Sequence, residues 1–468
     1  MPKARIILPY ALLLCQLLAA GPASALTDEE IFRDLRFNFI NPGGRSLAMG
    51  GAFVSLANDA TAAQANPAGL TTMLSSQLFA EIRFASPDDI KTSTSFRDPI
   101  NPSDGFDVNV TTSPNQTASP SFISYTYPLD RVSFGVSRQE VISIDNRTTS
   151  NYDFLFGTQS DIRRAEGTVK LGLVNWNLSA AYRVTDKFRV GLTVSFGILS
   201  LDSSVVNSYV DPTGTVIGVP ELAGVPLEMY RTTGDDSDSD VTATLGLLWK
   251  ISDTLAFGAS YRQGGSFEVQ QVLGSNPIDA AIIPGTINST VFLNESGTVL
   301  TADNSTYAFD TAFNVPDVAV VGISWTPLPQ LTLALDATRI SYSDLLKGFN
   351  SRLNILTAGF QNESDATFTV DDQTNLHFGA EYMLPTIGEG TIVLLRAGYH
   401  QDKDNRVRSD FAPGGFGLGS NDNFPGAPDN NHYSLGAGVV VGNSFQLDAA
   451  ADFSDRGSEA VLSLIYKF

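Results

Sequence analysis

Cysteine is almost absent from this chain of 468 residues, which contains only Cys15. It lies in an apolar run, residues 6–20, that follows a basic start and precedes the small residues of positions 23–25. This order is typical of a secretory signal, so we expect residues 1–25 to be removed on export. The exported chain then has neither disulfides nor thiolate metal sites, and it gains stability in another way.

Basic residues are scarce, since the chain contains 29 Lys and Arg residues but 50 Asp and Glu residues. Nucleic acid is therefore excluded as a partner, because phosphate binding needs clustered positive charge. Histidine is rarer still, and His377, His400 and His432 are too scattered in the sequence to predict a metal site. None of them accompanies a serine-centred motif, so we expect no hydrolase, no other enzyme and no cofactor.

Long apolar runs are missing after the export signal, so no transmembrane helix is predicted. Linkers rich in proline and serine are missing too, and composition does not divide the chain into separate domains. The remaining alternatives are a soluble protein and a β-barrel of the membrane.

The chain is rich in alternating apolar and polar residues from residue 76 onward. In residues 241–251, VTATLGLLWKI, every second side chain from Val241 to Ile251 is apolar, which is typical of a β-strand. Residues 187–197, 375–384 and 445–453 show the same period. A soluble sandwich also alternates, so alternation alone does not decide between the two classes.

Strand length and the joins favour the membrane barrel. About fourteen strands are predicted, many of about the 9–11 residues that a tilted strand needs to cross a bilayer. Tight joins near residues 128, 185, 252, 327, 386 and 442 alternate with long polar joins. Short turns on one side and long loops on the other are typical of an outer-membrane β-barrel. The strands are predicted to start near residues 76, 120, 131, 165, 187, 238, 254, 315, 330, 373, 390, 431, 445 and 457.

Aromatic residues and the C-terminus agree with a barrel. Tyrosine and tryptophan fall near strand ends on the predicted lipid face, where they form interfacial girdles. The chain ends EAVLSLIYKF, which resembles the C-terminal strand by which the barrel-assembly machinery of Gram-negative bacteria recognises its clients. The girdle candidates are Tyr125, Tyr127, Tyr182, Trp249, Tyr261, Trp325, Tyr382, Tyr399 and Tyr433.

Residues 26–75 do not read as strands and are predicted to form a small helical plug, or hatch, inside the lumen of the barrel formed by residues 76–468. A barrel of this size encloses more space than its own inward side chains fill. Thr27 with Glu30 predicts a capping box for one helix, and Asp59 a cap for a second. Asn66 is predicted to cap a third helix, with Pro67 at its first position.

The stretch GGRSLAMGGAFVSLANDATAAQANPAGL resembles the N-terminal hatch of the FadL family of hydrophobic-compound transporters. Its Asn66, Pro67 and Ala68 match the family's Asn-Pro-Ala element. The resemblance implies a fourteen-stranded, plugged barrel that takes up long-chain fatty acids or hydrocarbons passively. It also implies hatch movement and a lateral opening at a kinked third strand.

In the predicted third strand, the lipid-facing phase of Val132, Phe134 and Val136 would place Arg138 and Glu140 in hydrocarbon. A charge there costs about 2–4 kcal/mol near the middle of a bilayer. A kink or bulge at Ser137, Arg138, Gln139 and Glu140 would relieve this cost and would form the lateral gate. Alternatively, these residues lie at the level of the lipid headgroups.

Arginine is the expected contact for a ligand carboxylate, because guanidinium binds carboxylate in a bidentate manner. Arg83, Arg262 and Arg396 fall in the inward phase and are the candidates, with pairing to interior acids as the alternative. Three hatch residues, Phe39, Met49 and Phe53, are candidates for the hydrophobic path, with packing inside the hatch as the alternative. The acidic residues 234–240, GDDSDSD, are predicted to form a solvated loop apex rather than a calcium site.

The predicted function is passive uptake of hydrophobic compounds in the outer membrane of a Gram-negative bacterium. The expected surroundings are the lipid bilayer and lipopolysaccharide, and the chain is expected to be a monomer. One alternative is a barrel that acts in protein secretion or surface attachment, since the type IX secretion shuttle proteins resemble the same architecture. Another is an open diffusion porin, against which the hatch-like N-terminus argues.

Overall fold

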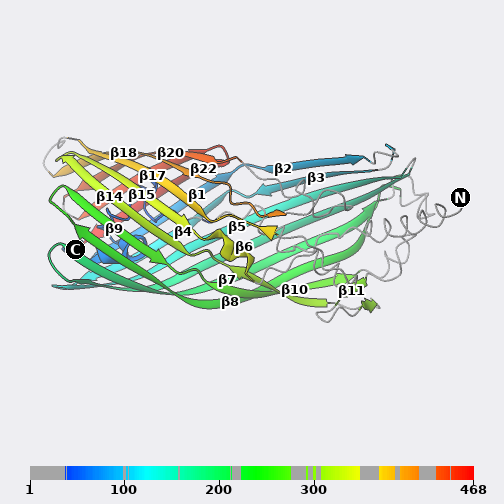
Figure 1. The fold of residues 1–468 in the computed structure, drawn as a ribbon, viewed down its shortest axis with the longest axis horizontal. Helices are drawn as coiled ribbons and strands as arrows, with labels where there is room; N and C mark the ends of the chain where they lie inside the picture. Colours follow the sequence, from blue (N-terminus) through cyan, green and yellow to red (C-terminus); the bar gives the residue numbers. More distant parts are fainter. Residues whose placement is uncertain are drawn as a thin grey trace, which may run out of the picture.

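Fourteen strands form a closed antiparallel barrel (Figure 1). The computed structural model describes residues 37, 39–97, 102–103, 105–156, 159–210, 212, 223–275, 291–293, 299–301, 307–347, 368–384, 390–409, 428–442 and 444–468. The ring closes where β1 (Gln77–Pro87) pairs with β22 (Gly457–Lys467). Between them lie β4 (Thr117–Pro128), β5 (Val132–Phe156), β6 (Gln159–Arg183), β7 (Phe188–Val210), β8 (Pro226–Lys250), β9 (Leu255–Arg262), β14 (Val318–Leu328), β15 (Leu331–Ile340), β17 (Gln373–Met383), β18 (Thr391–Asp402), β20 (Asn430–Val441) and β21 (Phe445–Ser454). The predicted barrel and its strand number are confirmed. The join near residue 386 and the export signal lie outside the described residues.

Part of what the sequence predicts as long loops is strand. The hairpin of β2 (Ile90–Arg97) and β3 (Gly105–Pro114) extends the barrel wall beside β5. The hairpin of β10 (Ser266–Ser275) and β13 (Tyr307–Asn314) pairs with β8. Strands β5, β6 and β8 have 25 residues each, more than a bilayer crossing needs. The short pairs are β11 (Val291–Leu293) with β12 (Val299–Thr301) and β16 (Phe368–Thr369) with β19 (Arg408–Ser409).

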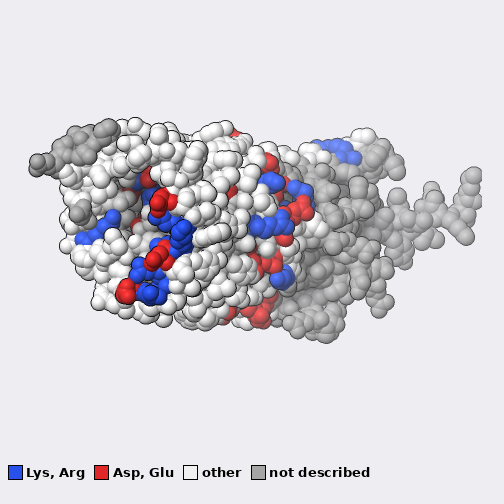
Figure 2. All heavy atoms as spheres, turned by 60° about the vertical axis from the view of Figure 1, so that its left-hand side comes forward, with Lys and Arg blue, Asp and Glu red and all other residues white. Residues whose placement is uncertain are grey.

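The outer face of the barrel carries exposed apolar side chains, as alternation predicts. Leu178, Leu245 and Leu435 are more than half exposed, although each belongs to a well-paired strand. All the predicted girdle aromatics are exposed except Tyr399, which is partly buried. In Figure 2 a wall almost free of charged residues separates two zones that contain them. Such a band fits a bilayer. No helix in the described part of the chain is long and apolar enough to span a membrane.

In the part of the hatch region that the structure describes, three short helices lie inside the barrel. They are α3 (Gly44–Ala48), α4 (Ala62–Ala65) and η1 (Pro67–Thr72), a 3₁₀ helix. The first contacts β20 and β21, and the last contacts β6, β7 and β8, so the segment reaches across the lumen. Its apolar residues from Leu47 to Leu70 are nearly all inaccessible to solvent. We call residues 39–75 the hatch from here on.

The predicted helix caps of the hatch differ in outcome. Asn66 caps η1 through its side chain, which accepts the Ala68 N–H at 3.2 Å, and Pro67 occupies the first position. Asp59 instead precedes the N-cap of α4, which is Thr61, and accepts the Thr61 N–H at 2.9 Å. The capping box of Thr27 and Glu30 lies outside the described residues.

Glycines of the barrel wall make room for the hatch. A Cβ on Gly398 would lie 2.0 Å from the Gly50 nitrogen, and one on Gly191 2.3 Å from the Pro67 carbonyl carbon. Real Cβ atoms do not approach other heavy atoms this closely. The hatch backbone therefore contacts the backbone of the barrel wall directly at these glycines. The same holds at Gly246, Gly258 and Gly379, against Asn66, Val54 and Met49.

Above the hatch, on the side opposite the tight turns, an apolar core fills part of the lumen. Phe267 and Val269 of β10 and Phe313 of β13 pack against the inner faces of β5, β6 and β7. The 3₁₀ helix η3 (Tyr342–Leu346) joins the same cluster. The upper lumen is therefore lined by apolar side chains.

The acidic segment 234–240 is strand, and its prediction as a loop apex is wrong. It belongs to β8, where the backbone ladder to the next strand is interrupted between Gly234 and Thr244. Side-chain carboxylates replace the missing carbonyl acceptors along this gap. Asp240 accepts the Ser266 N–H at 2.9 Å, Asp238 the Glu268 N–H at 2.8 Å, and Asp236 the Gln270 N–H at 2.8 Å.

Candidate ligand-binding cavity

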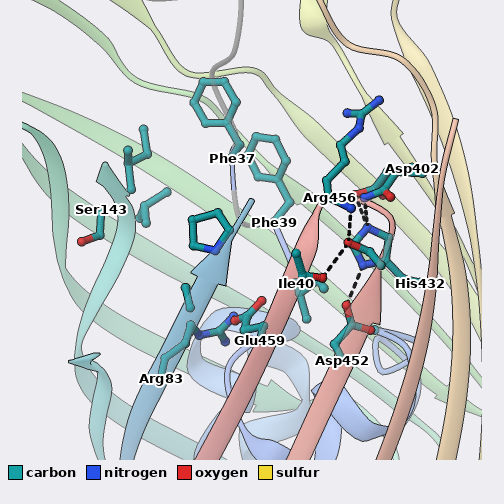
Figure 3. A pocket seen from close by; sticks show the side chains of 18 of the residues that line it. Phe37, Phe39, Ile40, Arg83, Ser143, Asp402, His432, Asp452, Arg456 and Glu459 are labelled. Atoms are coloured by element: carbon teal, nitrogen blue, oxygen red, sulfur yellow. Dashed lines mark hydrogen bonds and ion pairs between the residues drawn. The ribbon is translucent and has the colours of Figure 1, made fainter. Parts of the chain in front are cut away.

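A cavity of about 310 Å³ lies in the lumen between the hatch and the apolar core (Figure 3). Figure 3 shows the rings of Phe37 and Phe39 on one side and His432, between Asp402 and Asp452, on another. An apolar wall opposite a polar one is suited to an amphipathic ligand.

The apolar wall contains an aromatic cluster. The rings of Phe37 and Phe39 stack with centroids 5.2 Å apart, and Tyr342 of η3 meets Phe39 edge-on at 6.4 Å. Val318 and Ile340 line the same side. Phe39, a predicted path residue, thus lies at the cavity.

The other two predicted path residues lie elsewhere. Met49 is inaccessible and packs in the hatch against Ala334 of β15, while Phe53 packs against α4 and Leu70. Neither of them lines the cavity. Their positions correspond to the alternative role of packing within the hatch.

Two of the predicted carboxylate-binding arginines already have acidic partners. Arg83 lines the cavity and forms ion pairs with Glu81, at 3.0 Å, and with Glu459. Arg396 does not line the cavity. It is buried in the wall between Glu381, at 2.7 Å, and Asp448, at 2.6 Å.

Arg262 differs from both, because it lines the cavity and has no acidic partner among the described residues. Its hydrogen-bond partner is the side-chain amide of Gln64 in the hatch. In the amide orientation that satisfies both side chains, the Gln64 oxygen accepts from Nε and Nη2 of Arg262 at 3.1 Å, and the Gln64 nitrogen donates to Gln139 at 2.8 Å. A guanidinium bonded only to neutral amides retains its charge for an anionic ligand. Hatch residue Gln64 thereby connects this cation to the predicted gate.

The Asn-Pro-Ala element attaches the hatch to the wall. Asn66 Nδ2 donates to the carbonyl oxygens of Val54 in the hatch and Leu247 in β8, each at 2.9 Å. Pro67 and Ala68 lie against Gly191 of β7, where no side chain intervenes. These three residues are structural and do not line the cavity.

A buried ion-pair network holds the other end of the hatch. Arg45 of α3 forms a bidentate pair with Glu381 of β17, both contacts at 2.9 Å, and donates to Asn58 at 2.7 Å. Although burial alone lowers the pKa of Arg45, the Glu381 carboxylate outweighs it and raises that pKa above its ordinary value. Glu381 also binds Arg396, so the hatch is part of the charge network of the wall.

The barrel wall is interrupted beside the predicted gate. β4 pairs with β5 only up to Gln139, and β3 resumes the pairing at Asn146. On its other side β5 remains paired with β6, with a register shift between Glu140 and Ile142. The irregularity thus lies at Val141, one residue beyond the predicted segment of Ser137 to Glu140.

Side chains bridge this interruption. Arg138, which points outward, donates to the Pro120 carbonyl oxygen at 2.5 Å, and Glu140 accepts from the Ser119 hydroxyl at 2.5 Å. Ser137 points inward and accepts from Asn177 at 3.1 Å. The cavity reaches the interruption, because Ser119 and Glu140 also line it.

The sequence profile of one protein family, described as Outer membrane protein transport protein (OMPP1/FadL/TodX), matches residues 36–454. The chain belongs to this family. As a FadL/TodX protein it is an outer-membrane transport channel for hydrophobic compounds and not an enzyme. No curated protein shows significant similarity to it.

Solved structures of the FadL/TodX fold align over almost the whole chain. A Pseudomonas aeruginosa FadL homologue has a TM-score of 0.60 and 16% identity and covers 93% of this chain and 99% of its own. The Ralstonia pickettii toluene transporter TbuX has a TM-score of 0.56 at 16% identity, covering 92% and 99%. The P. putida toluene transporter TodX has a TM-score of 0.56 at 17% identity, again covering 92% and 99%. At such identity the likeness shows the fold.

The three histidines of this FadL/TodX chain meet in the fold. They are scattered in the sequence, yet His377 lies opposite His400 on β17 and β18, and His400 opposite His432 on β18 and β20. The rings stack with centroids 5.2 and 4.1 Å apart. His377 also contacts the Gly50 carbonyl of the hatch at 2.8 Å. Only strand register reveals this cluster, because the spacing along the chain depends on loop length.

Proposed function

We propose that this transporter takes up an amphipathic molecule with a long apolar part and a carboxylate, such as a long-chain fatty acid. The observation that carries the proposal is Arg262, a cavity-lining cation without an acidic partner in the described structure. The cavity of about 310 Å³ is of a size suited to a small ligand. Phe37, Phe39 and Tyr342 offer the apolar part its wall.

Binding couples to the hatch through Gln64. A carboxylate that binds the Nε and Nη2 edge of Arg262 competes with the Gln64 oxygen for the same guanidinium donors. The charged acceptor forms the stronger hydrogen bonds. Displaced from Arg262, Gln64 no longer fixes Gln139, the last residue of β5 paired with β4.

Release proceeds sideways through the interruption between β4 and β5. The cavity borders this opening, and only side-chain contacts such as that of Ser119 with Glu140 cross it in the described structure. A hydrophobic molecule leaving there enters the bilayer directly instead of crossing water. Transport is then passive and requires no cofactor.

The predicted alternative of a protein-secretion barrel has less support. A cavity of about 310 Å³ holds a small molecule, not a folded protein. We further propose assembly by the barrel-assembly machinery, a monomeric state, and a position in the outer membrane with lipopolysaccharide around the outer rim.

Uptake by cells that lack their own fatty-acid transporter tests the proposal. R262Q is expected to reduce uptake of labelled oleate about tenfold and to leave uptake of toluene unchanged. R339Q is the matched control, because Arg339 is an exposed arginine of the barrel outside the cavity. If R262Q transports oleate like the wild type, the carboxylate assignment is wrong. If only toluene is transported by the wild type, the ligand is a neutral hydrocarbon.

A further inference from the structure

The polar wall of the cavity, which His432 and Asp452 line, borders a cluster of metal-ligating side chains that the transport proposal does not use. His400, His432 and Asp452 come from three adjacent strands, β18, β20 and β21, and each offers a ligand atom within 4.8 Å of the other two. Ligand atoms on one tetrahedral zinc ion lie about 3.3 Å apart, so the side chains must rotate to close the set.

A free ring nitrogen of His400 supports a ligand role, whereas both ring nitrogens of His432 already have partners, Asp452 and Asn430. His400 is 1% exposed, and its Nδ1 has no hydrogen-bond partner. A buried imidazole nitrogen without a partner is costly, and a metal ion is one of the few partners that satisfy it. This observation is independent of the clustering itself.

The surrounding charge favours a cation. Two carboxylates face His432, since Asp452 lies 2.6 Å from its Nδ1 and Asp402 lies 3.6 Å from its Nε2. Arg456 interacts electrostatically with Asp402 and offsets part of this negative charge. The Ser434 hydroxyl donates to the second oxygen of Asp452 at 2.6 Å, an outer contact of the kind that orients metal ligands.

We propose that His400, His432 and Asp452 bind one divalent transition-metal ion of the zinc class, with a further coordination position open to the cavity. Imidazole and carboxylate donors suit this class of metal. A metal lies in the plane of each ligating ring, whereas the rings of His400 and His432 stack at 17°. Binding therefore turns His432 away from the stack and toward the cavity that it lines.

Cobalt titration of the whole protein in detergent tests the site. The protein carries a purification tag without histidine and is stripped of metal with a chelator. Co²⁺ is then added, and its visible d–d absorption is recorded, followed by displacement with Zn²⁺. We expect one bound Co²⁺ per chain with the spectrum of low coordination number, lost on addition of Zn²⁺.

Three conservative variants locate the ion. H432Q and D452N are expected to weaken Co²⁺ binding at least about tenfold. H377Q is the matched control, because His377 lies in the same stack but outside the set of three ligands. Heat-modifiable migration on gels verifies that each barrel is folded. The proposal is overturned if the wild type shows no such spectrum, if H432Q and D452N bind like the wild type, or if H377Q loses binding equally.

Discussion

Asn66 Nδ2 lies 2.9 Å from the Leu247 carbonyl oxygen, so one side-chain amide joins the hatch to strand β8 of the barrel. The same nitrogen donates to Val54, while the amide oxygen accepts from Ala68. Donor and acceptor are both used, which only a carboxamide of this length satisfies at this place. The Asn-Pro-Ala element is therefore a structural attachment of the hatch.

The first prediction concerns this attachment. N66D keeps the shape of the side chain but turns a donor into an acceptor that faces two carbonyl oxygens, and N66A removes all three bonds. Each change costs about 1–3 kcal/mol of hatch docking. We expect larger and more frequent conductance steps in planar bilayers, stronger for N66D, with the barrel still folded. Wild-type conductance from both variants would show that the hatch is held elsewhere.

The second prediction concerns the glycines beneath the hatch. G398A places a methyl group 2.0 Å from the Gly50 nitrogen, so we expect a displaced hatch and raised ion conductance. G135A is the matched control, since a Cβ there meets Ala63 and Leu70 of the hatch at an ordinary 3.6 Å. Trypsin cleavage at Arg45 in the hatch offers a second measurement, with faster cutting expected only in G398A. Equal conductance and equal trypsin cleavage in G398A and G135A would contradict the close packing of the hatch against Gly398.

The sequence predicts the repetitive part of this fold well, because each strand carries its own period of two. The alternation within residues 241–251 predicts which side chains face the lipid, and no information about the neighbouring strands is needed. The acidic residues of 234–240 mislead, since their partners are N–H groups of β10, about thirty residues further along. Composition alone makes them resemble a solvated loop.

The sequence predicts the candidate site less completely, because this site also depends on contacts between segments that are distant in the sequence. Inward phase identifies Arg83, Arg262 and Arg396 equally, but only the fold shows which of them has acidic partners. The histidine stack depends on the register of strands separated by loops of unequal length. Contacts between distant segments leave no local pattern.

The third prediction tests lateral release. The only native cysteine in the sequence is Cys15, so S119C with E140C introduces a single pair across the interruption between β4 and β5. Closing it with a short reducible thiol crosslinker is expected to abolish oleate uptake, and reduction to restore it. S137C with N177C is the control, because this pair joins β5 to β6, which are already hydrogen-bonded. Unaffected uptake after complete crosslinking at 119 and 140 would exclude this exit.

The fourth prediction concerns the carboxylates that replace backbone acceptors between β8 and β10. D238A removes the acceptor of the Glu268 N–H and is expected to destabilise the β10 hairpin by about 1 kcal/mol, since the site is exposed to water. D238N keeps an acceptor oxygen and should retain most of this stability. D235A, on the opposite face of β8, serves as the control. Amide hydrogen exchange at residues 266–270 measures this loss of stability. Exchange there should be faster than in the wild type in D238A, but not in D238N or D235A. Because the three carboxylates bind alternate N–H groups of one strand, D236A with D238A is expected to accelerate exchange more than the two single changes combined. Purely additive effects would mean that each carboxylate stabilises only its own N–H group.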